Sequence, residues 1–340
     1  QEIIETKSNK ISKENSLQDK EYKVDKSIVE AILTLDKIAK QKRKEREKKG
    51  SINFNKKEVS FKLNEDKDPV EIIFKESKDA NKLIEEFMLI ANKKVAALFT
   101  DIKKQKYIYR VHDVPDIEKL KNLKHIVRGF GYTLDISSSK GISKSLNKLL
   151  DEVKGKKEQN LIESLTLRSM SKAEYSTNNI GHYGLAFINY THFTSPIRRY
   201  PDVLVHRLLQ DLLNQQYGRY DKNLQKKSVY CSEQENTAVK AERESIKFMQ
   251  IKYMQDKIGN EYKGTISGVS EWGIYVEIEE NKCEGMVYVR DIKDDRYFYN
   301  VEEQSLIGKN TKNKYQLGDS VKIEVKKADL IKKHLDFTII

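Results

Sequence analysis

The chain has 340 residues, enough for two domains that each bury a core of their own. Lys and Arg total 64 against 52 Asp and Glu, and the net charge of +12 suits a polyanionic partner, although a solvated lysine-rich surface would give the same excess. Its two cysteines, Cys231 and Cys283, lie far apart without metal-ligand spacing, which argues against a disulfide framework and a zinc site. Free thiols predict a reducing, cytoplasmic location.

The sequence carries no visible targeting or membrane segment. No apolar run approaches the ~20 residues that a membrane-spanning helix needs, and no signal peptide is apparent. We therefore expect no membrane partner. The chain begins with Gln1 rather than Met, so we expect it to be a fragment of a longer polypeptide.

The N-terminal part is polar and then helical. Residues 1–23 hold few large apolar groups and predict a mobile segment, or a helix that needs a missing partner. From Val24 apolar residues recur at helical spacing, and this helix ends in the charged run 40–49, KQKRKEREKK, before Gly50. The charged run suits a solvated helix face with i,i+4 pairs, and its place beside KGSINF (49–54) leaves a binding role open.

A hairpin and several helices follow. Val59–Leu63 and Val70–Phe74 alternate as strands around a turn at 64–68. Further helices are predicted over 79–99, from Pro115 to Gly129 or Gly131, and over 146–153, 161–170, 202–215 and 232–256.

The chain changes character at Gly259. Strand-like alternation appears at Tyr262–Ile266, Ile274–Ile278, Met286–Val289 and Val321–Val325. This pattern predicts a small all-β barrel.

The most informative stretch is 181–209, GHYGLAFINYTHFTSPIRRYPDVLVHRLL. Pro196 and Pro201 restrict the backbone between them, because each proline fixes its own φ and constrains the residue before it. Arg198 and Arg199 lie in this stiffened segment. Two guanidinium groups on a restrained backbone suit a fixed phosphate, so this stretch predicts binding of phosphodiesters.

The run THFTSPIRRYPD followed by HRLL resembles the signature of the RNase II/RNase R family of 3′→5′ exoribonucleases. KGSINF (49–54), DANKLIEEFMLIAN (79–92), YRVHDVPDIEKL (109–120) and KAERES (240–245) resemble the same family. The tail from Gly259 resembles its S1-type RNA-binding domain. The resemblance implies an α+β fold, with the C-terminal part of an RNB-type catalytic domain over 1–256 and an S1-type OB-fold barrel over 257–340.

The resemblance implies two residues at the chemical step. Arg198 matches an arginine close to the scissile phosphate, where it would neutralise developing charge; the alternative is an i,i+4 pair with Asp202. Glu242 in KAERES matches a glutamate near the catalytic centre, which would orient a water or hold Arg198; the alternative is a surface helix charge. Arg199 would face either the RNA backbone or a carboxylate.

The resemblance also implies RNA contacts in the first part. Phe54 matches an aromatic residue that stacks on the 3′ base, a contact that tolerates any base, and its alternative is a core phenylalanine. Glu85 matches a carboxylate that meets the terminal ribose, a contact that distinguishes RNA from DNA. The alternative for Glu85 is an exposed helix residue paired with Lys82. His182 and His192 fit RNA contacts, metal ligands or core histidines, of which we favour the last.

In the last domain, Trp272, Tyr275 and Tyr288 fall on neighbouring strand patterns, as in S1-type OB-folds that bind RNA with one aromatic face. EGMVYVRDI (284–292) departs from the family pattern, because Tyr288 and Arg290 stand where the family usually has a His and a Ser. Stacking and phosphate contact remain available to these two residues.

The resemblance implies Mg²⁺ as the cofactor of the full-length enzyme, held by clustered aspartates. No such cluster occurs here; the nearest acidic groups are Glu85–Glu86, Asp294–Asp295 and Asp113 with Asp116. We expect the metal ligands upstream of Gln1 and none in this chain.

The whole enzyme would hydrolyse single-stranded RNA processively from its 3′ end to nucleoside 5′-monophosphates. The alternatives are a non-catalytic RNA-binding subunit of a split enzyme, or an S1-type RNA-binding protein that uses only its last domain. The resemblance leaves association with the ribosome or the degradation machinery open.

Overall fold

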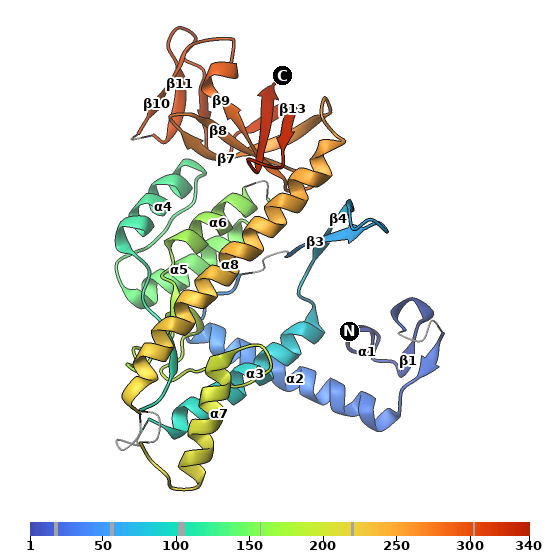
Figure 1. The fold of residues 1–340 in the computed structure, drawn as a ribbon, viewed down its shortest axis with the longest axis vertical. Coiled ribbons are helices and arrows are strands. Elements are labelled where there is room, and N and C mark those ends of the chain that lie inside the picture. The colour runs from blue at the N-terminus through green and yellow to red at the C-terminus, as the bar shows by residue number, and fades with distance from the viewer. Residues whose placement is uncertain (17–19, 55–57, 101–105, 157, 219–220, 302) are drawn as a thin grey trace. The chain divides into compact units, whose positions relative to one another are not determined.

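The computed structural model describes residues 1–16, 20–54, 58–100, 106–156, 158–218, 221–301 and 303–340 (Figure 1). The chain forms two compact units that do not follow sequence order. The first comprises Gln1–Lys56, Glu76–Glu152 and Leu165–Asn236, and the second Lys57–Lys75, Val153–Ser164 and Thr237–Ile340. Within the described part of the chain, no helix is long and apolar enough to cross a membrane.

Two long helices, α2 (Lys26–Lys48) and α3 (Asp79–Leu98), pack against each other in the first unit. The Asp25 side chain caps α2 by accepting a hydrogen bond from the Ser27 amide. The buried residues of α3 recur every three residues from Leu83 to Val95, and two of them, Glu86 and Asn92, are polar. Arg46 of α2 donates to Glu86 at 2.5 Å, so a buried ion pair joins the helices.

The described part of residues 1–23 folds onto these helices. Helix α1 (Glu2–Thr6) precedes a two-stranded ladder, β1 (Lys10–Ile11) with β2 (Tyr22–Lys23). Ile3 and Ile11 are buried with Val29 of α2. The prediction of a mobile segment was therefore wrong, because a few isoleucines suffice to dock a short, otherwise polar stretch on a neighbouring apolar helix face.

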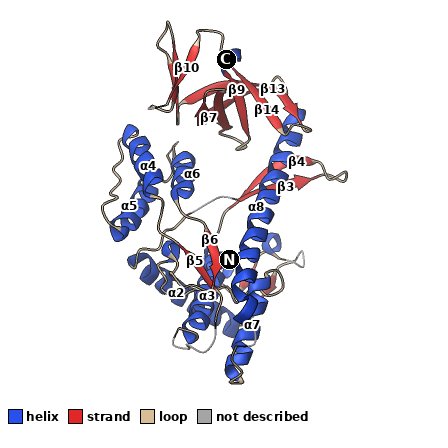
Figure 2. Ribbon diagram, turned by 60° about the vertical axis from the view of Figure 1, so that its left-hand side comes forward, coloured by secondary structure: helices blue, strands red, loops and turns tan. Residues whose placement is uncertain are grey.

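The remainder of the first unit centres on a short antiparallel ladder, visible in Figure 2 as β5 (Tyr109–His112) beside β6 (Ala173–Ser176). Helix α7 (Tyr200–Leu213) begins with Pro201 in its first turn, where a missing amide costs nothing, and buries Leu204, Val205 and Leu208. Its core also takes residues from α3, β5 and β6. The first unit also contains α4 (Ile117–Gly129) and α5 (Ser139–Glu152), whereas α6 (Gln159–Ser169) is divided between the two units after Ser164.

Helix α8 (Leu224–Gln255) runs through both units, which divide at Asn236. It begins eight residues before the predicted start at Ser232. The predicted hairpin is confirmed as β3 (Glu58–Leu63) and β4 (Pro69–Lys75), and it belongs to the second unit, where Ile72 packs on the barrel core.

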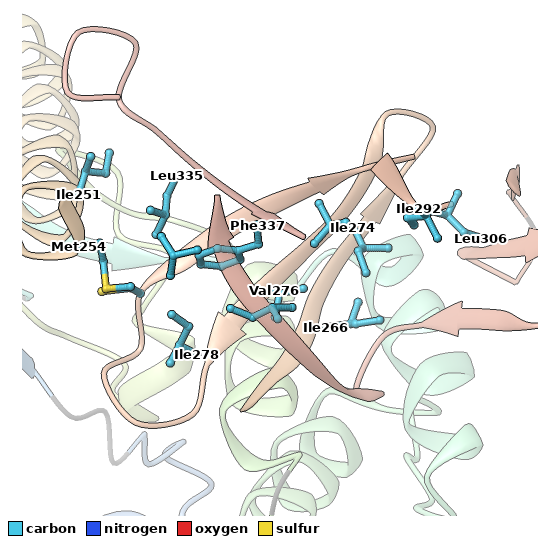
Figure 3. Packing of buried hydrophobic residues seen from close by; sticks show 14 of the residues in the cluster. Ile251, Met254, Ile266, Ile274, Val276, Ile278, Ile292, Leu306, Leu335 and Phe337 are labelled. Carbon is cyan, nitrogen blue, oxygen red and sulfur yellow. The ribbon is translucent and has the colours of Figure 1, made fainter. Parts of the chain in front are cut away.

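The second unit holds a closed barrel in the order β13 (Ser320–Asp329), β14 (His334–Ile339), β9 (Glu284–Tyr288), β8 (Gly273–Ile278), β7 (Glu261–Ser270). Alternate residues of β8 point inward: Ile274, Val276 and Ile278 are fully buried. Figure 3 shows them with Phe337, and with Ile251 and Met254 of α8.

One glycine is needed for the barrel geometry. Gly273 has φ +155, and a Cβ there would lie 2.0 Å from the Val287 carbonyl oxygen, so only glycine lets β8 approach β9 so closely. A separate three-stranded sheet of β10 (Tyr297–Asn300), β11 (Ser305–Gly308) and β12 (Lys314–Gln316) follows β9 in the chain. The α+β fold class and the terminal all-β barrel are confirmed.

Candidate nucleic-acid interface

Residues 190–199, which we call the signature loop, have no regular structure and are held by hydrogen bonds to the surrounding elements. Thr191, fully buried, donates its hydroxyl to the Ile108 carbonyl oxygen at 2.7 Å. The Tyr190 carbonyl accepts from the Arg110 amide at 2.9 Å. His206 of α7 contacts the Phe193 carbonyl oxygen through Nε2 at 2.8 Å. The loop is thus fixed at both its start and its middle.

Asp202 holds the end of the loop. Its side chain is 0% exposed, and Oδ1 accepts from the Ser195 amide and from Arg199 Nη2, both at 2.8 Å. Arg199 therefore meets a carboxylate, which is one of its two predicted surroundings. Arg198, one residue earlier, lies exposed in the turn after Pro196, and the ion pair with Asp202 is made by Arg199. The loop therefore presents one exposed and one fixed guanidinium.

Asn92 joins the loop to α3. It is 2% exposed, it donates through Nδ2 to Tyr190 Oη at 3.2 Å, and its Oδ1 accepts from the Phe193 amide at 3.0 Å. Both ends of the carboxamide are thus used on the loop. A buried amide with both ends satisfied fixes relative position, because either lost bond leaves an unpaired buried polar group.

Helix α3 and the loop together line a cavity of about 500 Å³, which we call the α3 pocket. Two predicted RNA-binding residues, Glu85 and Arg199, line it together with the anchoring pair Asn92 and Tyr190. The other lining residues are Ala80, Asn81, Ile84, Met88 and Leu89. A carboxylate, a guanidinium and an amide around an apolar floor can bind a ligand with hydroxyl, phosphate and ring components.

Rings of the loop and of neighbouring segments form a run of aromatic and histidine contacts. The His112 and His182 rings stack at 4.9 Å between centroids, and Tyr175 Oη lies 2.8 Å from His192 Nδ1. Burial lowers the pKa of His182 to about 3 and that of His192 to about 2, with neighbouring positive charge adding to both shifts. Neutral, largely buried rings fit the interpretation of core histidines.

Phe54 ends an extended segment that follows α2. Ser51–Phe54 forms no strand, and it is held by the Ile52 amide, which donates to the Gly184 carbonyl at 2.8 Å, and by Asn147 Nδ2, which donates to the Ser51 carbonyl at 2.8 Å. Phe54 itself is half-buried, and its predicted stacking on RNA stays a prediction. Glu242 lies exposed on α8 in the second unit, so the α3 pocket is built without it.

The barrel carries four predicted RNA-binding residues on or next to β8 and β9. Tyr275 pairs with Met286 and Gly273 with Tyr288 across β8 and β9, so Tyr275 and Tyr288 share the face opposite the core. Tyr275 is 40% exposed, and Trp272, in the turn before β8, is 69% exposed. The Arg290 guanidinium lies 4.7 Å from the Tyr288 ring centroid. The face therefore combines exposed rings with a cation.

Three of the acidic residues nearest to a metal cluster already have partners. Glu86 pairs with Arg46, and Asp116 caps α4 by accepting from the Glu118 amide at 2.9 Å. Asp295 accepts hydrogen bonds from the Arg296, Asn310 and Thr311 amides. Among the described residues, no group of three or more His, Cys, Asp or Glu is arranged to hold a metal ion. The residues present do not fit the Mg²⁺ that the resemblance implies.

Sequence reasoning missed the residues that hold the site together. Asn92 and Glu86 occupy buried positions of α3, and a polar residue at a core-facing helical position was the available signal. Tyr190, which lines the pocket and receives the Asn92 bond, had no separate signal because it is one of 18 tyrosines.

The RNB domain model matches residues 1–215, and the S1 RNA binding domain model matches residues 255–340. Ribonuclease R of Aquifex aeolicus (strain VF5) is 37% identical over 317 residues, which are 92% of this chain and 45% of that protein. Ribonuclease R of Thermotoga maritima is 37% identical over 329 residues, 94% of this chain and 46% of that protein.

A solved structure, Mycoplasma genitalium RNase R in complex with ribose methylated single-stranded RNA, is similar with a TM-score of 0.87 and 28% identity over 95% of this chain and 51% of that chain. The chain thus spans about half the length of the relatives that it matches. Because the RNB model alone matches more than half of its residues, the chain belongs to the RNB family, as an RNase R-type protein whose RNB segment is followed by an S1 domain.

Proposed function

We propose that this chain is the 3′-end-binding and S1 part of an RNase R-type 3′→5′ exoribonuclease, which hydrolyses single-stranded RNA to nucleoside 5′-monophosphates. The observation that carries the proposal is the α3 pocket, because Glu85 and Arg199, matched to the family from separate motifs, line the same cavity. The M. genitalium relative was solved in complex with single-stranded RNA, which supports RNA as the ligand here. The two free cysteines support a cytoplasmic location.

In this proposal each residue has a separate task. Glu85 accepts hydrogen bonds from the terminal ribose hydroxyls, Arg199 contacts a backbone phosphate while Asp202 orients it, and Phe54 stacks on the terminal base. Arg198, which is exposed, neutralises charge that develops on the scissile phosphate. Trp272, Tyr275 and Tyr288 stack on bases further from the 3′ end. Glu242 acts near the phosphate if the assembled enzyme brings it there.

The metal that the family implies finds no fitting ligand set among the described residues, so hydrolysis needs carboxylates from a further part of the polypeptide or from a partner. The alternative function, a non-catalytic RNA-binding subunit of a split enzyme, differs only in where those carboxylates reside. The 340-residue chain with a labelled single-stranded RNA should bind without releasing mononucleotides in Mg²⁺. Mononucleotide release by this chain alone would contradict that expectation.

The α3 pocket can be tested by its preference for ribose. Glu85→Gln should weaken binding of an RNA with a normal 3′ nucleotide more than binding of the same RNA ending in a deoxynucleotide, because only the former offers the 2′-hydroxyl. Glu118→Gln, an exposed change on α4, is the matched control. An equal loss for both oligonucleotides would refute the ribose contact.

A further inference from the structure

Four lysines lie on two helices that pack against each other in the first unit: Lys42 in α2, Lys49 directly after it, and Lys93 and Lys94 in α3. We call them the lysine cluster. Partial burial lowers the pKa of Lys93, and the positive charges of Lys49, Lys94 and Lys42 lower it further, with Glu45 acting in the opposite direction. All four lysines are exposed. The cluster is thus a concentration of like charge that water can reach.

One lysine of α2 outside the cluster, Lys40, is neutralised by carboxylates. Lys40 of α2 lies 2.8 Å from Asp36 and 3.0 Å from Asp79, and these carboxylates raise its pKa. In the cluster, Lys42 pairs with Glu45 at 3.0 Å, whereas Lys49, Lys93 and Lys94 have no ion pair among the described residues. Like charges held together without counter-charges repel each other, and a bound polyanion relieves that repulsion.

The cluster is linked to the α3 pocket by two routes. Lys93 Nζ lies 5.2 Å from the Phe187 ring centroid, and the Phe187 ring lies 5.6 Å from that of Tyr190, which lines the pocket. Along α3, Lys93 follows Glu85 by eight residues, or about 12 Å of helix. A strand whose end occupies the pocket would reach the cluster within a few nucleotides.

We propose that the lysine cluster binds backbone phosphates of a single-stranded RNA whose 3′ terminus occupies the α3 pocket. The proposal rests on the proposed function, because it takes RNA as the ligand of the pocket. Lysine ammonium groups bind phosphates as mobile point charges and do not read sequence, so this surface adds affinity that is sensitive to salt and indifferent to base identity.

The first experiment measures how salt weakens RNA binding. Lys49→Gln, Lys93→Gln and Lys94→Gln are combined in the 340-residue chain, and a fluorescent single-stranded oligonucleotide is titrated at several KCl concentrations. Three lost phosphate contacts at ~0.7 each should reduce the slope of log K against log salt by about 2. The matched control combines Lys119→Gln, Lys121→Gln and Lys124→Gln, three exposed lysines of α4, and removes the same net charge.

The control slope should equal that of the unmodified chain. An unchanged slope in the cluster variant, or an equal change in both triple variants, would overturn the proposal. If the unmodified chain binds no RNA, the proposed function fails together with this inference. If the unmodified chain binds RNA and the cluster variant shows the same salt slope as the control variant, this inference alone fails.

The second experiment needs no substitution. Acetylation of the native chain with an amine-reactive reagent, followed by peptide mass spectrometry, reports each lysine separately. Saturating RNA should protect Lys49, Lys93 and Lys94 several-fold and leave Lys119, Lys121 and Lys124 as reactive as before. Equal protection of both sets, or none at the cluster, would contradict local phosphate binding.

Discussion

The signature loop and the outer barrel face that carries Tyr275 and Tyr288 present the side chains proposed to contact RNA in opposite ways. In the loop, buried polar side chains such as Asp202 and Asn92 hold an irregular backbone, and the group presented is a charge. On the barrel, strand pairing alone orients Tyr275 and Tyr288, and the groups presented are rings. Buried hydrogen bonds fix the direction of one side chain in the loop, whereas strand pairing places several side chains on a broad surface of the barrel.

The difference predicts where each region is vulnerable. A loop held by buried hydrogen bonds loses stability when one anchor is removed, because its partners stay buried and unpaired. A face whose rings point to solvent can lose a ring and keep its fold, because the core beneath it contains none of them. Stability and RNA affinity should therefore respond separately in the two regions.

The largest expected effect is a loss of folding stability at acidic pH, caused by His182 and His192 of the first unit. His182 and His192 are neutral when folded, with pKa values of about 3 and about 2, while the unfolded chain protonates them near 6.5. The unfolded state binds more protons below that pH, so the free energy of unfolding should fall from pH 6.5 toward pH 3. Each histidine contributes ~1.4 kcal/mol per pH unit, or roughly 4 kcal/mol for both at pH 5.

Urea denaturation at several pH values measures this slope. His192→Gln should reduce the slope of the unfolding free energy against pH by the ~1.4 kcal/mol per pH unit that one histidine contributes. His125→Gln, an exposed change on α4, should leave that slope unchanged. An unfolding free energy that stays level between pH 7 and pH 5 would show that these histidines are not buried as described.

The next effect is on rate. In the full-length enzyme, Arg198→Ala should lower the single-turnover rate by ~10²–10³ at saturating RNA, because the proposed cation at the developing charge is lost. Binding should change little, since RNA is held by many contacts. Arg198→Lys should recover only part of the rate, because lysine lacks the planar fork. Arg128→Ala on α4 is the control, and a normal rate in saturated Arg198→Ala would make Arg198 a structural residue.

The third largest effect is expected on stability when Asp202, which anchors the signature loop, is replaced. Asp202→Ala leaves the Ser195 amide and Arg199 without their shared acceptor and should reduce the free energy of unfolding by about 3 kcal/mol. Asp202→Asn keeps one acceptor oxygen and should cost less, and Asp151→Ala, exposed on α5, should cost little. Denaturant titration of the three variants decides, and equal stability of Asp202→Ala and Asp151→Ala would contradict the anchoring.

The smallest effect is expected on the barrel. Trp272→Ala or Tyr275→Ala should weaken single-stranded RNA binding by ~1–3 kcal/mol for each lost stack, with unfolding unchanged. Fluorescence anisotropy gives the affinity, and Phe298→Ala, an exposed ring on β10 outside the barrel, is the matched control. If RNA affinity is unchanged and the free energy of unfolding falls, the rings stabilise the barrel, and the barrel face then resembles the signature loop in depending on its side chains for stability.

Sequence patterns predicted the elements that depend on local alternation. The hairpin, α3 and the inward residues of β8 follow from apolar periodicity, because burial repeats at the period of the element. The N-terminal ladder, the early start of α8 and the sheet of β10, β11 and β12 were not predicted. The N-terminal ladder depends on contacts distant in sequence, such as Ile3 with Val29, which no local window contains.

For the candidate site, family motifs brought Glu85 and Arg199 to one pocket, but sequence could not reveal the anchors. Whether an arginine is exposed or fixed depends on which side chain its neighbour in space supplies. Arg198 and Arg199 are adjacent and identical in type, yet Asp202 holds only the second. The predicted alternative had assigned that carboxylate to Arg198.

The barrel closes unevenly. Strands β7 and β8 are joined by six register pairs, whereas β9 and β14 are joined by a single parallel pair, Met286 with Asp336. Opening the contact between β9 and β14 breaks the fewest interstrand bonds, so amide protons of β14 that point toward β9 should exchange with solvent before those that join β7 to β8. Met286 is also the cross-strand neighbour of Tyr275. The contact between β9 and β14, which should open most easily, therefore lies directly beside the face that carries Tyr275 and Tyr288.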